Sequence, residues 1–274
     1  MRGQIVKIIA GYYDIESDKK IYRVRGSGNL RNREVVPIVG DFVEFTPNEF
    51  LWTIYPRKNF FIRPKTANID QAMIVMSLKN PSFSQFLLDK FLAIVESKDI
   101  LPIIIFTKVD LDINNEYKQA YESQGYQVFV VNNLNFNTHQ LKSLFAHKTT
   151  VFMGQSGVGK SSTINNIANL NLVTQEISHA LNRGKHTTRV VEIIDFAGGK
   201  LIDTPGFSSI DFDLTKISLA RSYHDFRALS KDCQFVKNCL HDHEVGCAIK
   251  KAVSENIILP SRYESYLKLL KEAK

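Results

Sequence analysis

The pattern of hydrophobic and polar residues differs between the first 66 residues and the rest of the chain. Over residues 3–66, short runs rich in Val, Ile, Tyr and Phe alternate with turn sequences such as RGSGN and TPNE. This pattern predicts short strands without a convincing helix, and it is typical of a small β-barrel of the oligonucleotide-binding (OB) size. We expect Trp52 and the tyrosines of this region to lie in the barrel core, with base stacking as the alternative.

From residue 67 the pattern changes to strands that alternate with helices, which indicates a parallel sheet with crossover helices. The predicted strands cover residues 71–77, 102–106, 126–131 and 149–153. The predicted helices cover residues 83–99, 114–124 and 138–146, and a further helix follows Lys160. The sequence AGG predicts a hairpin between strands at 191–196 and 200–203.

From about residue 215 the pattern is mainly helical, and it ends in an amphipathic segment, SRYESYLKLLKEAK. The sequence therefore predicts a multidomain protein. We expect an N-terminal all-β OB-like barrel over 1–66, a central α/β domain over 67–214 and a mainly helical domain over 215–274.

A phosphate-binding loop is predicted between the strand at 149–153 and the helix that follows. The pattern G-x-x-x-x-G-K-[ST] is met by Gly154, Gln155, Ser156, Gly157, Val158, Gly159, Lys160 and Ser161, and Ser162 follows. Glycines let successive backbone N–H groups point at phosphate oxygens, and the helix adds its positive end. We expect Lys160 to reach the β- and γ-phosphates and Ser161 to bind Mg²⁺.

Two further segments fit the magnesium and γ-phosphate side of such a site. Asp203-Thr-Pro-Gly206 places a carboxylate near Mg²⁺ and a glycine N–H near the γ-phosphate. In GKHTTR, Thr187 and Thr188 both qualify to complete the coordination of Mg²⁺, with Thr188 as the working assignment.

The sequence Thr107-Lys108-Val109-Asp110 resembles a guanine-reading motif. Asp110 can accept hydrogen bonds from N1–H and N2–H₂ of guanine, a pair of donors that adenine lacks, so ATP would fit only if Asp110 did not reach the base. Lys108 would pack along the plane of the base. Thr107 stands where the usual motif has Asn, and its hydroxyl can still bond to neighbouring loops.

The order of these motifs is reversed, because the guanine motif precedes the phosphate loop. The strands before residue 132 look like the second half of a GTPase sheet, and those from residue 149 look like the first half. The sequence therefore predicts a circularly permuted P-loop GTPase, which the proximity of chain termini in compact domains permits.

Phe207 follows Gly206, where many GTPases carry the Gln that orients the attacking water. Phe207 cannot form such hydrogen bonds. His186 is the best internal candidate for this catalytic role, and the alternative is that His186 is a loop residue without one. We expect slow turnover unless a partner orders these loops.

All three cysteines lie within one short segment, as Cys233-x₅-Cys239-x-His241-x₅-Cys247. Three thiolates and an imidazole predict a closed, structural Cys₃His zinc site. His243 could replace His241, and three free thiols are the alternative to a metal site.

Charge is distributed unevenly along the 274 residues, whose net charge is +7. Residues 1–66 carry 12 Lys+Arg and 7 Asp+Glu, and residues 215–274 carry 11 and 7, whereas the segment between them carries 12 and 14. Basic flanks favour contact with nucleic acid over an unevenly charged surface without a partner. No apolar run reaches the length of a membrane span, and the N-terminus does not resemble a signal peptide, so we expect a cytoplasmic protein.

The combination of barrel, permuted GTPase and Cys₃His segment resembles the family of bacterial ribosome small-subunit-dependent GTPase A. Matching stretches include VGDFVEF, PRKNFFIRP, GQSGVGKSSTIN, GKHTTR, LIDTPGF and GCAIKKAV. Thr107 in place of Asn, and a first cysteine spacing one residue longer than expected, are departures from the family pattern.

The resemblance implies a Mg²⁺-dependent GTPase that binds the small (30S) ribosomal subunit late in its maturation and hydrolyses GTP to GDP and phosphate when docked. It implies contact with rRNA through the barrel and the zinc module, one structural Zn²⁺ and a monomer without membrane attachment. Two alternatives remain open: a GTP-gated binding module whose hydrolysis is incidental, and a permuted GTPase that serves tRNA or a membrane surface.

Overall fold

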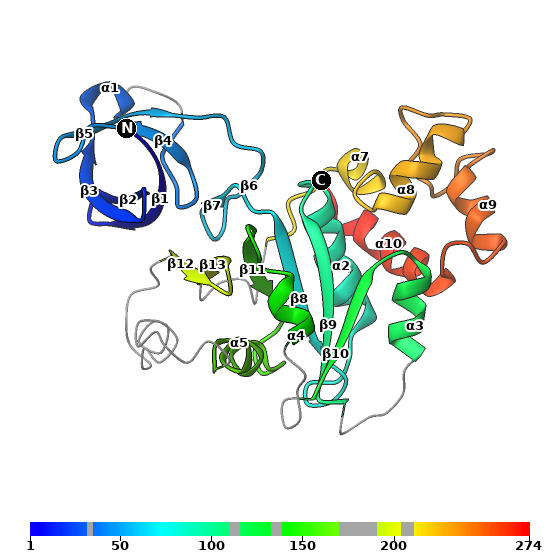
Figure 1. The fold of residues 1–274 in the computed structure, drawn as a ribbon. Helices are drawn as coiled ribbons and strands as arrows, with labels where there is room; N and C mark the ends of the chain where they lie inside the picture. The colour runs from blue at the N-terminus through cyan, green and yellow to red at the C-terminus, as the bar shows by residue number, and fades with distance from the viewer. Residues whose placement is uncertain (32–34, 110–115, 133–138, 170–190, 204–210) are drawn as a thin grey trace. The chain divides into compact units, whose positions relative to one another are not determined.

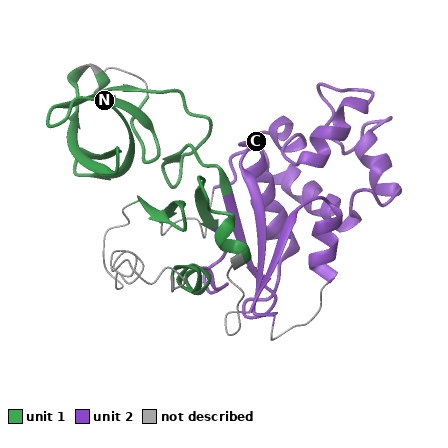
Figure 2. Ribbon diagram, in the orientation of Figure 1, with its two compact units in different colours: residues 1–71, 137–152, 161–210 green, residues 72–136, 153–160, 211–274 purple. Residues whose placement is uncertain are grey.

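The structure, a computed structural model, describes residues 1–31, 35–109, 116–132, 139–169, 191–203 and 211–274 (Figure 1). The chain divides into two compact units (Figure 2). Unit 1 comprises residues 1–71, 137–152 and 161–210, and unit 2 comprises residues 72–136, 153–160 and 211–274.

Five strands at the start of unit 1 form the predicted barrel (Figure 1). They are β1 (Arg2–Ile9), β2 (Tyr12–Ser17), β3 (Lys20–Gly26), β4 (Phe42–Phe45) and β5 (Phe50–Ile54). Their order is β1-β2-β3-β5-β4, and β4 pairs again with β1. This last pairing closes the sheet on itself and confirms the barrel.

The barrel core follows the alternation of its strands, because residues two apart point to the same face. Its buried residues are Ile5, Ile15, Val24, Leu30, Val43, Phe45 and Leu51. Leu30 comes from α1 (Gly28–Arg31), so the expectation of no helix in this region was wrong for this one short turn. Four residues are too few for a helical periodicity to show. The expectation of a core position was also wrong for Trp52, whose exposed fraction is 42%.

The remainder of unit 1 contains the predicted hairpin, which is formed by the last two of its strands. The elements of this part of unit 1 are β6 (Phe60–Phe61), β7 (Thr66–Ala67), α4 (His139–Ser143), β11 (Thr149–Met153), α5 (Lys160–Asn169), β12 (Glu192–Phe196) and β13 (Gly199–Asp203). β12 and β13 are antiparallel, β13 is parallel to β11, and β12 pairs with β1 of the barrel. A Cβ on Gly199 would lie 1.9 Å from the carbonyl oxygen of Phe145, so only glycine fits at the start of β13.

Unit 2 holds a parallel sheet with its covering helices (Figure 1). The strands are β8 (Gln71–Ser77), β9 (Leu101–Thr107) and β10 (Gln127–Val131), in the order β10-β9-β8, and the helices are α2 (Gln85–Glu96) and α3 (Glu116–Ser123). Every residue of β8 is buried, as a strand covered on both faces requires. The Ser84 hydroxyl accepts a hydrogen bond from the N–H of Leu87 and so caps α2.

The C-terminal part of unit 2 is helical, as predicted. It comprises α7 (Lys216–Ala220), α8 (His224–Leu229), the 3₁₀ turn η2 (Ser230–Asp232), α9 (Ala248–Ser254) and α10 (Pro260–Glu272). α10 packs against α2 of the same unit (Figure 1). Among the helices that the structure describes, none combines the length and apolar character that crossing a membrane requires.

Candidate functional site

The phosphate loop lies between β11 and α5, where the sequence predicts it. Gly154 has a φ of 138°, and a Cβ there would lie 2.2 Å from the carbonyl oxygen of Val75 in β8. The loop therefore begins with a close approach of two backbones that only glycine allows. Val158, in the middle of the loop, is buried.

Lys160 is the first residue of α5, and its side chain turns back to the loop that precedes it. Its Nζ donates to the carbonyl oxygens of Gly154 and Gln155, each at 2.6 Å. Partial burial lowers the pKa of this ammonium group. The cation expected to bind phosphate is thus held against the backbone of the phosphate loop itself.

The guanine motif and the phosphate loop, written in reversed order along the chain, are in direct contact within unit 2. Thr107, at the end of β9, is fully buried, and its hydroxyl donates to the carbonyl oxygen of Val158 at 2.5 Å. The Lys108 ammonium group donates to the carbonyl oxygen of Gly157 at 2.9 Å and also to that of Asn80. Thr107 and Lys108, the first two residues of the motif, therefore support the backbone of the phosphate loop.

Asn80 is a residue that sequence reasoning did not single out for this site. It precedes Pro81 in the connection between β8 and α2, and its carbonyl oxygen fixes the end of the Lys108 side chain. An Asn-Pro dipeptide after a buried strand indicates a turn, which is the signal that could have drawn attention to it.

Several predicted site residues have no described position. Asp110, His186, Thr187, Thr188, Gly206 and Phe207 lie outside the described residues. The backbone of Asp203 ends β13, where it pairs with Glu192 of β12. Ser161 and Ser162 are exposed in the first turn of α5, next to Lys160.

The predicted zinc ligands come together in unit 2. The ligand atoms of Cys233, Cys239, His241 and Cys247 all lie within 4.8 Å of one another, and all four residues are buried. The Cys233 and Cys247 Sγ atoms are 4.0 Å apart, and they lie 3.7 and 3.4 Å from Nδ1 of His241. In a tetrahedral site with Zn–S bonds of about 2.3 Å, neighbouring ligand atoms are separated by about 3.8 Å, so the four residues fit a zinc ion.

His241 rather than His243 belongs to this cluster. Its Nε2 lies 3.1 Å from the carbonyl oxygen of Ala220, and burial lowers its pKa. A neutral ring that donates from Nε2 presents the lone pair of Nδ1 to the thiols, as a metal ligand must. The side chain of His243, by contrast, is 94% exposed beside Asp242.

Burial also affects whether the cysteines of the cluster are protonated. It raises the pKa of Cys239 to about 12, so thiolates would be stable there only beside a cation. Two consecutive backbone carbonyls within the cysteine segment are fixed by α10, since the hydroxyls of Tyr263 and Tyr266 donate to the carbonyl oxygens of His241 and Leu240. The cysteine segment is thereby attached to the C-terminal helix.

A phosphate loop between a strand and a helix, in contact with a guanine motif that precedes it in the chain, defines a circularly permuted P-loop GTPase. Comparison with known proteins agrees with this class. The chain matches the RsgA GTPase family over residues 54–213 and the RsgA N-terminal domain over residues 2–50. The chain belongs to the RsgA GTPase family.

Relatives and solved structures match the chain over nearly its full length. It is 47% identical to the small ribosomal subunit biogenesis GTPase RsgA of Mycoplasmopsis agalactiae, over 99% of this chain and 98% of the relative. It is 44% identical to the protein of the same name from Streptococcus pneumoniae, over 99% and 94%.

Among solved structures, the chain resembles YloQ, described as a circularly permuted GTPase, with a TM-score of 0.80, 35% identity and coverage of 99% and 94%. It resembles YjeQ from Thermotoga maritima with a TM-score of 0.81, 28% identity and coverage of 99% and 97%. The predicted family and fold class are confirmed.

Proposed function

We propose that this protein is a GTP hydrolase that binds the small (30S) ribosomal subunit and its rRNA and acts late in the maturation of that subunit. The proposal that the protein binds and hydrolyses a nucleotide rests on the contact of Thr107 and Lys108 with the carbonyl oxygens of Val158 and Gly157. The names of the relatives, small ribosomal subunit biogenesis GTPases, support the ribosomal part.

GTP is the proposed nucleotide because Asp110 follows directly on Thr107, Lys108 and Val109. The described part of the motif is fixed to the phosphate loop, and a carboxylate two residues beyond Lys108 would select the two donors of guanine. Mg²⁺ would be held by Ser161 and Thr188, with Asp203 acting through water, and it would neutralise charge on the phosphates.

Hydrolysis would depend on loops that a partner orders. Phe207 replaces the usual water-orienting Gln, so we assign that role to His186 and propose slow turnover by the free protein and stimulation by the docked subunit. Loss of the γ-phosphate would release these loops and weaken the grip on rRNA.

The three predicted domains would divide this work. The barrel (1–66) and the helical domain (215–274) would contact rRNA through their basic surfaces, and the GTPase domain (67–214) would bind nucleotide. Zn²⁺ held by Cys233, Cys239, His241 and Cys247 would be structural, because four protein ligands leave no open position. We further propose a cytoplasmic monomer.

The decisive experiment measures GTP hydrolysis with no addition, with purified small subunits and with purified large subunits. Stimulation by small subunits alone supports the proposal, and Lys160→Ala should abolish turnover in every condition. A binding module with incidental hydrolysis would show nucleotide-dependent affinity for the subunit but unchanged turnover, which would refute the enzymatic part.

Two further measurements address the mechanism. His186→Ala should lose the stimulated rate, and an unchanged stimulated rate would remove His186 from the mechanism. Equal affinity of the subunit for the GDP-bound protein and for the protein bound to a non-hydrolysable GTP analogue would rule out release through the γ-phosphate.

A further inference from the structure

A row of aromatic and cationic side chains crosses the barrel surface over three adjacent strands. Tyr12 of β2 pairs with Arg25 of β3, and Arg25 pairs in turn with Phe50 of β5. Trp52 lies two residues further along β5. Directly paired residues share one face of a sheet, so the four side chains form one group, which we call the Trp52 platform.

The platform is exposed although its aromatic members are large. The exposed fraction is 42% for Phe50 and 42% for Trp52, whereas Leu51 between them is fully buried in the barrel core. The core is complete without these two rings. Two large neighbouring aromatic side chains on a small soluble barrel therefore point to a binding surface.

The backbone of β5 sets the position of Trp52. Glu44 pairs with Thr53 and Phe45 pairs with Leu51, so Trp52 is the extra residue of a β-bulge. A bulge redirects a side chain and is a common device beside functional sites. Here Nε1 of Trp52 donates to Oγ1 of Thr46 at 2.9 Å.

Phe50 supports the indole from the other side. Its ring meets that of Trp52 edge to face, with centroids 5.8 Å apart and planes inclined by 71°. The indole is thus held by a hydrogen bond and by an aromatic contact while much of its surface remains exposed. Such a side chain loses little conformational entropy when a ligand stacks on it.

Charge identifies the kind of ligand. The Arg25 guanidinium lies 4.7 Å from the centroid of the Tyr12 ring, and the backbone of Arg25 is paired in the sheet with that of Phe50. Residues 1–66 carry a net charge of +5. Exposed aromatic faces beside cations are how proteins bind single-stranded nucleic acid, where bases stack on the rings and phosphates meet the cations.

We propose that Trp52 and Phe50 stack on an unpaired base of single-stranded RNA, while Arg25 contacts an adjacent phosphate. The proposal rests on the proposed function, which makes rRNA the source of that strand. A paired base is excluded, because its faces are covered by its neighbours in the stack. A protein partner would be favoured by a continuous apolar patch, whereas this row is interrupted by the cation of Arg25.

Trp52 is the only tryptophan in the chain, so tryptophan fluorescence reports directly on the Trp52 platform. Full-length protein is titrated with a single-stranded RNA oligonucleotide and with a duplex of the same length, and intrinsic fluorescence is recorded. We expect the single strand to quench the emission at concentrations where the duplex does not. Absence of quenching by saturating single strand would overturn the proposal.

Variants separate stacking from charge. By anisotropy of labelled RNA, Trp52→Ala should raise Kd by about 5- to 150-fold, the loss expected for one stacked base, and Trp52→Phe should retain most of the affinity. Trp52→Ala should leave the salt dependence unchanged, whereas Arg25→Gln should lower its slope by about 0.7. The matched control is Tyr117→Ala, an exposed aromatic residue of α3 in the central region, which should change neither quantity.

Binding to small subunits then connects the platform with the proposed function. Trp52→Ala should weaken subunit binding and leave unstimulated GTP hydrolysis unchanged. If the variant bound subunits less well but the wild type bound no single-stranded RNA, the occupant would be a ribosomal protein and our proposal would be wrong. If small subunits failed to stimulate GTP hydrolysis by the wild type, the proposed function would be wrong. Quenching of Trp52 fluorescence by RNA would still support the binding of RNA to the platform.

Discussion

Thr107 illustrates how a single hydroxyl can join two sequence motifs. It lies at the end of β9 without solvent exposure, and its Oγ1 donates to the carbonyl oxygen of Val158 in the phosphate loop. A buried carbonyl that loses its donor costs about 1–3 kcal/mol. The conformation of the phosphate loop therefore depends on a residue that belongs to the guanine motif.

We predict that Thr107→Val, which keeps the shape but removes the hydroxyl, weakens binding of GDP by about 5- to 150-fold, the equivalent of 1–3 kcal/mol. Thr107→Ser, which keeps the donor, is the matched control and should bind GDP within a few-fold of the wild type. Titration with a fluorescent GDP analogue measures both. Equal affinities of the valine and serine variants would show that the hydroxyl does not support the loop.

His224 is held between two acceptors. Its Nδ1 lies 2.7 Å from Oε1 of the buried Glu96, and its Nε2 lies 2.9 Å from the carbonyl oxygen of Gln124. Both ring nitrogens can donate only in the imidazolium form. The hydrogen bond to Glu96 accordingly raises the pKa of His224, in spite of partial burial.

A raised pKa of a base stabilises the folded state at low pH. This contribution is complete below the unfolded pKa of about 6.5 and is lost as the pH rises through the higher folded value. We predict that the free energy of unfolding falls with pH in this window, and that His224→Asn removes this component. Urea unfolding between pH 6 and 8.5 measures it, and the exposed His147→Asn should keep the slope of the wild type. Parallel profiles for the wild type and His224→Asn would contradict the assignment.

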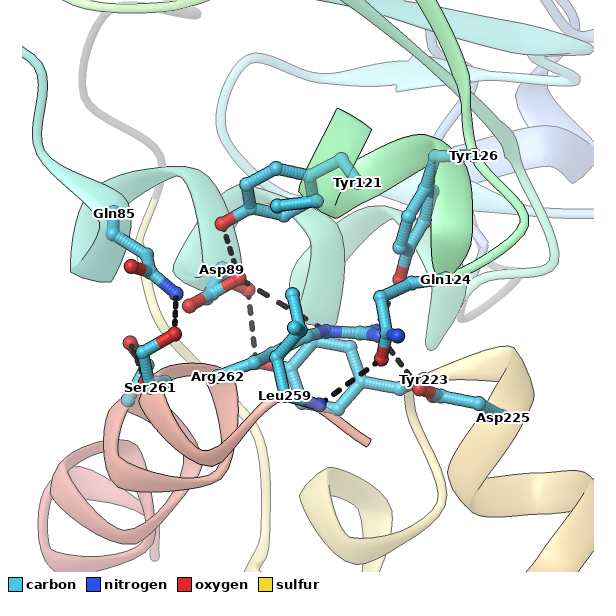
Figure 3. Close-up of polar contacts among 12 residues, drawn as sticks. Gln85, Asp89, Tyr121, Gln124, Tyr126, Tyr223, Asp225, Leu259, Ser261 and Arg262 are labelled. Carbon is cyan, nitrogen blue, oxygen red and sulfur yellow. Dashed lines mark hydrogen bonds and ion pairs between the residues drawn. The ribbon is translucent and has the colours of Figure 1, made fainter. Parts of the chain in front are cut away.

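At the scale of elements, Arg262 attaches α10 to the rest of unit 2 (Figure 3). The side chain is fully buried. Nη1 donates to Oδ2 of Asp225 in α8 at 2.6 Å, and Nη2 donates to the hydroxyl of Tyr126, which directly precedes β10. The guanidinium also lies 4.5 Å from the centroid of the Tyr223 ring.

Asp89 of α2 completes this cluster (Figure 3). Its Oδ1 accepts from the hydroxyl of Tyr121 at 2.8 Å and lies 4.0 Å from Nε of Arg262. Burial raises the pKa of Asp89 to about 6, while the nearby cation opposes the rise. Residues of α2, α3, α8 and α10, and the residue that precedes β10, therefore meet around one buried cation.

We predict that Arg262→Met lowers the free energy of unfolding by about 3–5 kcal/mol, because it leaves buried carboxylates without their counter-ion. Lys268→Met, an exposed position on the same helix, is the control and should stay within about 0.5 kcal/mol of the wild type. Urea unfolding followed by circular dichroism measures both, since the only tryptophan reports on the barrel. A loss below 1 kcal/mol would show that α10 is held by its apolar contacts alone.

The cysteine segment is an element that lacks a sufficient core of its own, so a metal ion would stabilise it. We predict that purified protein contains one Zn²⁺ per chain and that His241→Ala lowers this content, because Nδ1 of His241 faces the thiols. His243→Ala changes a 94% exposed neighbour and should retain the metal. Metal analysis after gel filtration measures the content, and equal loss in both variants would reject the assignment of His241.

The sequence predicted those elements whose hydrophobic pattern is long and uniform. The strands predicted at 71–77 and 149–153 have the bounds of β8 and β11, because buried parallel strands read as unbroken apolar runs. The two-residue strands β6 and β7 and the four-residue helix α1 carry no such pattern. Motif spacing identified the cysteine cluster.

The orientation of individual side chains was harder to predict from the sequence than the elements were. The choice between His241 and His243 depends on a single carbonyl, that of Ala220, and the exposure of Trp52 depends on a bulge. Both are consequences of tertiary structure. The contact of Lys108 with Asn80 likewise joins residues that no local pattern connects.

At the scale of the whole molecule, net charge distinguishes the two ends of the sequence from its middle. Residues 1–66 have a net charge of +5 and residues 215–274 a net charge of +4, while residues 67–214 have −2. A polyanion would therefore be attracted to the ends of the sequence rather than to its middle. The salt dependence of binding should reside in those ends.

We predict that Lys19→Gln with Lys20→Gln lowers the slope of log K against log salt for subunit binding by about 1.4–1.8. Lys19 lies in the exposed turn between β2 and β3, and Lys20 is the exposed first residue of β3. Each lysine that neutralises a phosphate releases counterions, so removal of both reduces the slope without abolishing affinity at low salt. The matched control, Lys118→Gln with Lys142→Gln, removes the same charge from the central region and should leave the slope unchanged. Equal changes in both double variants would mean that net charge alone, and not the barrel surface, attracts the ribosomal subunit.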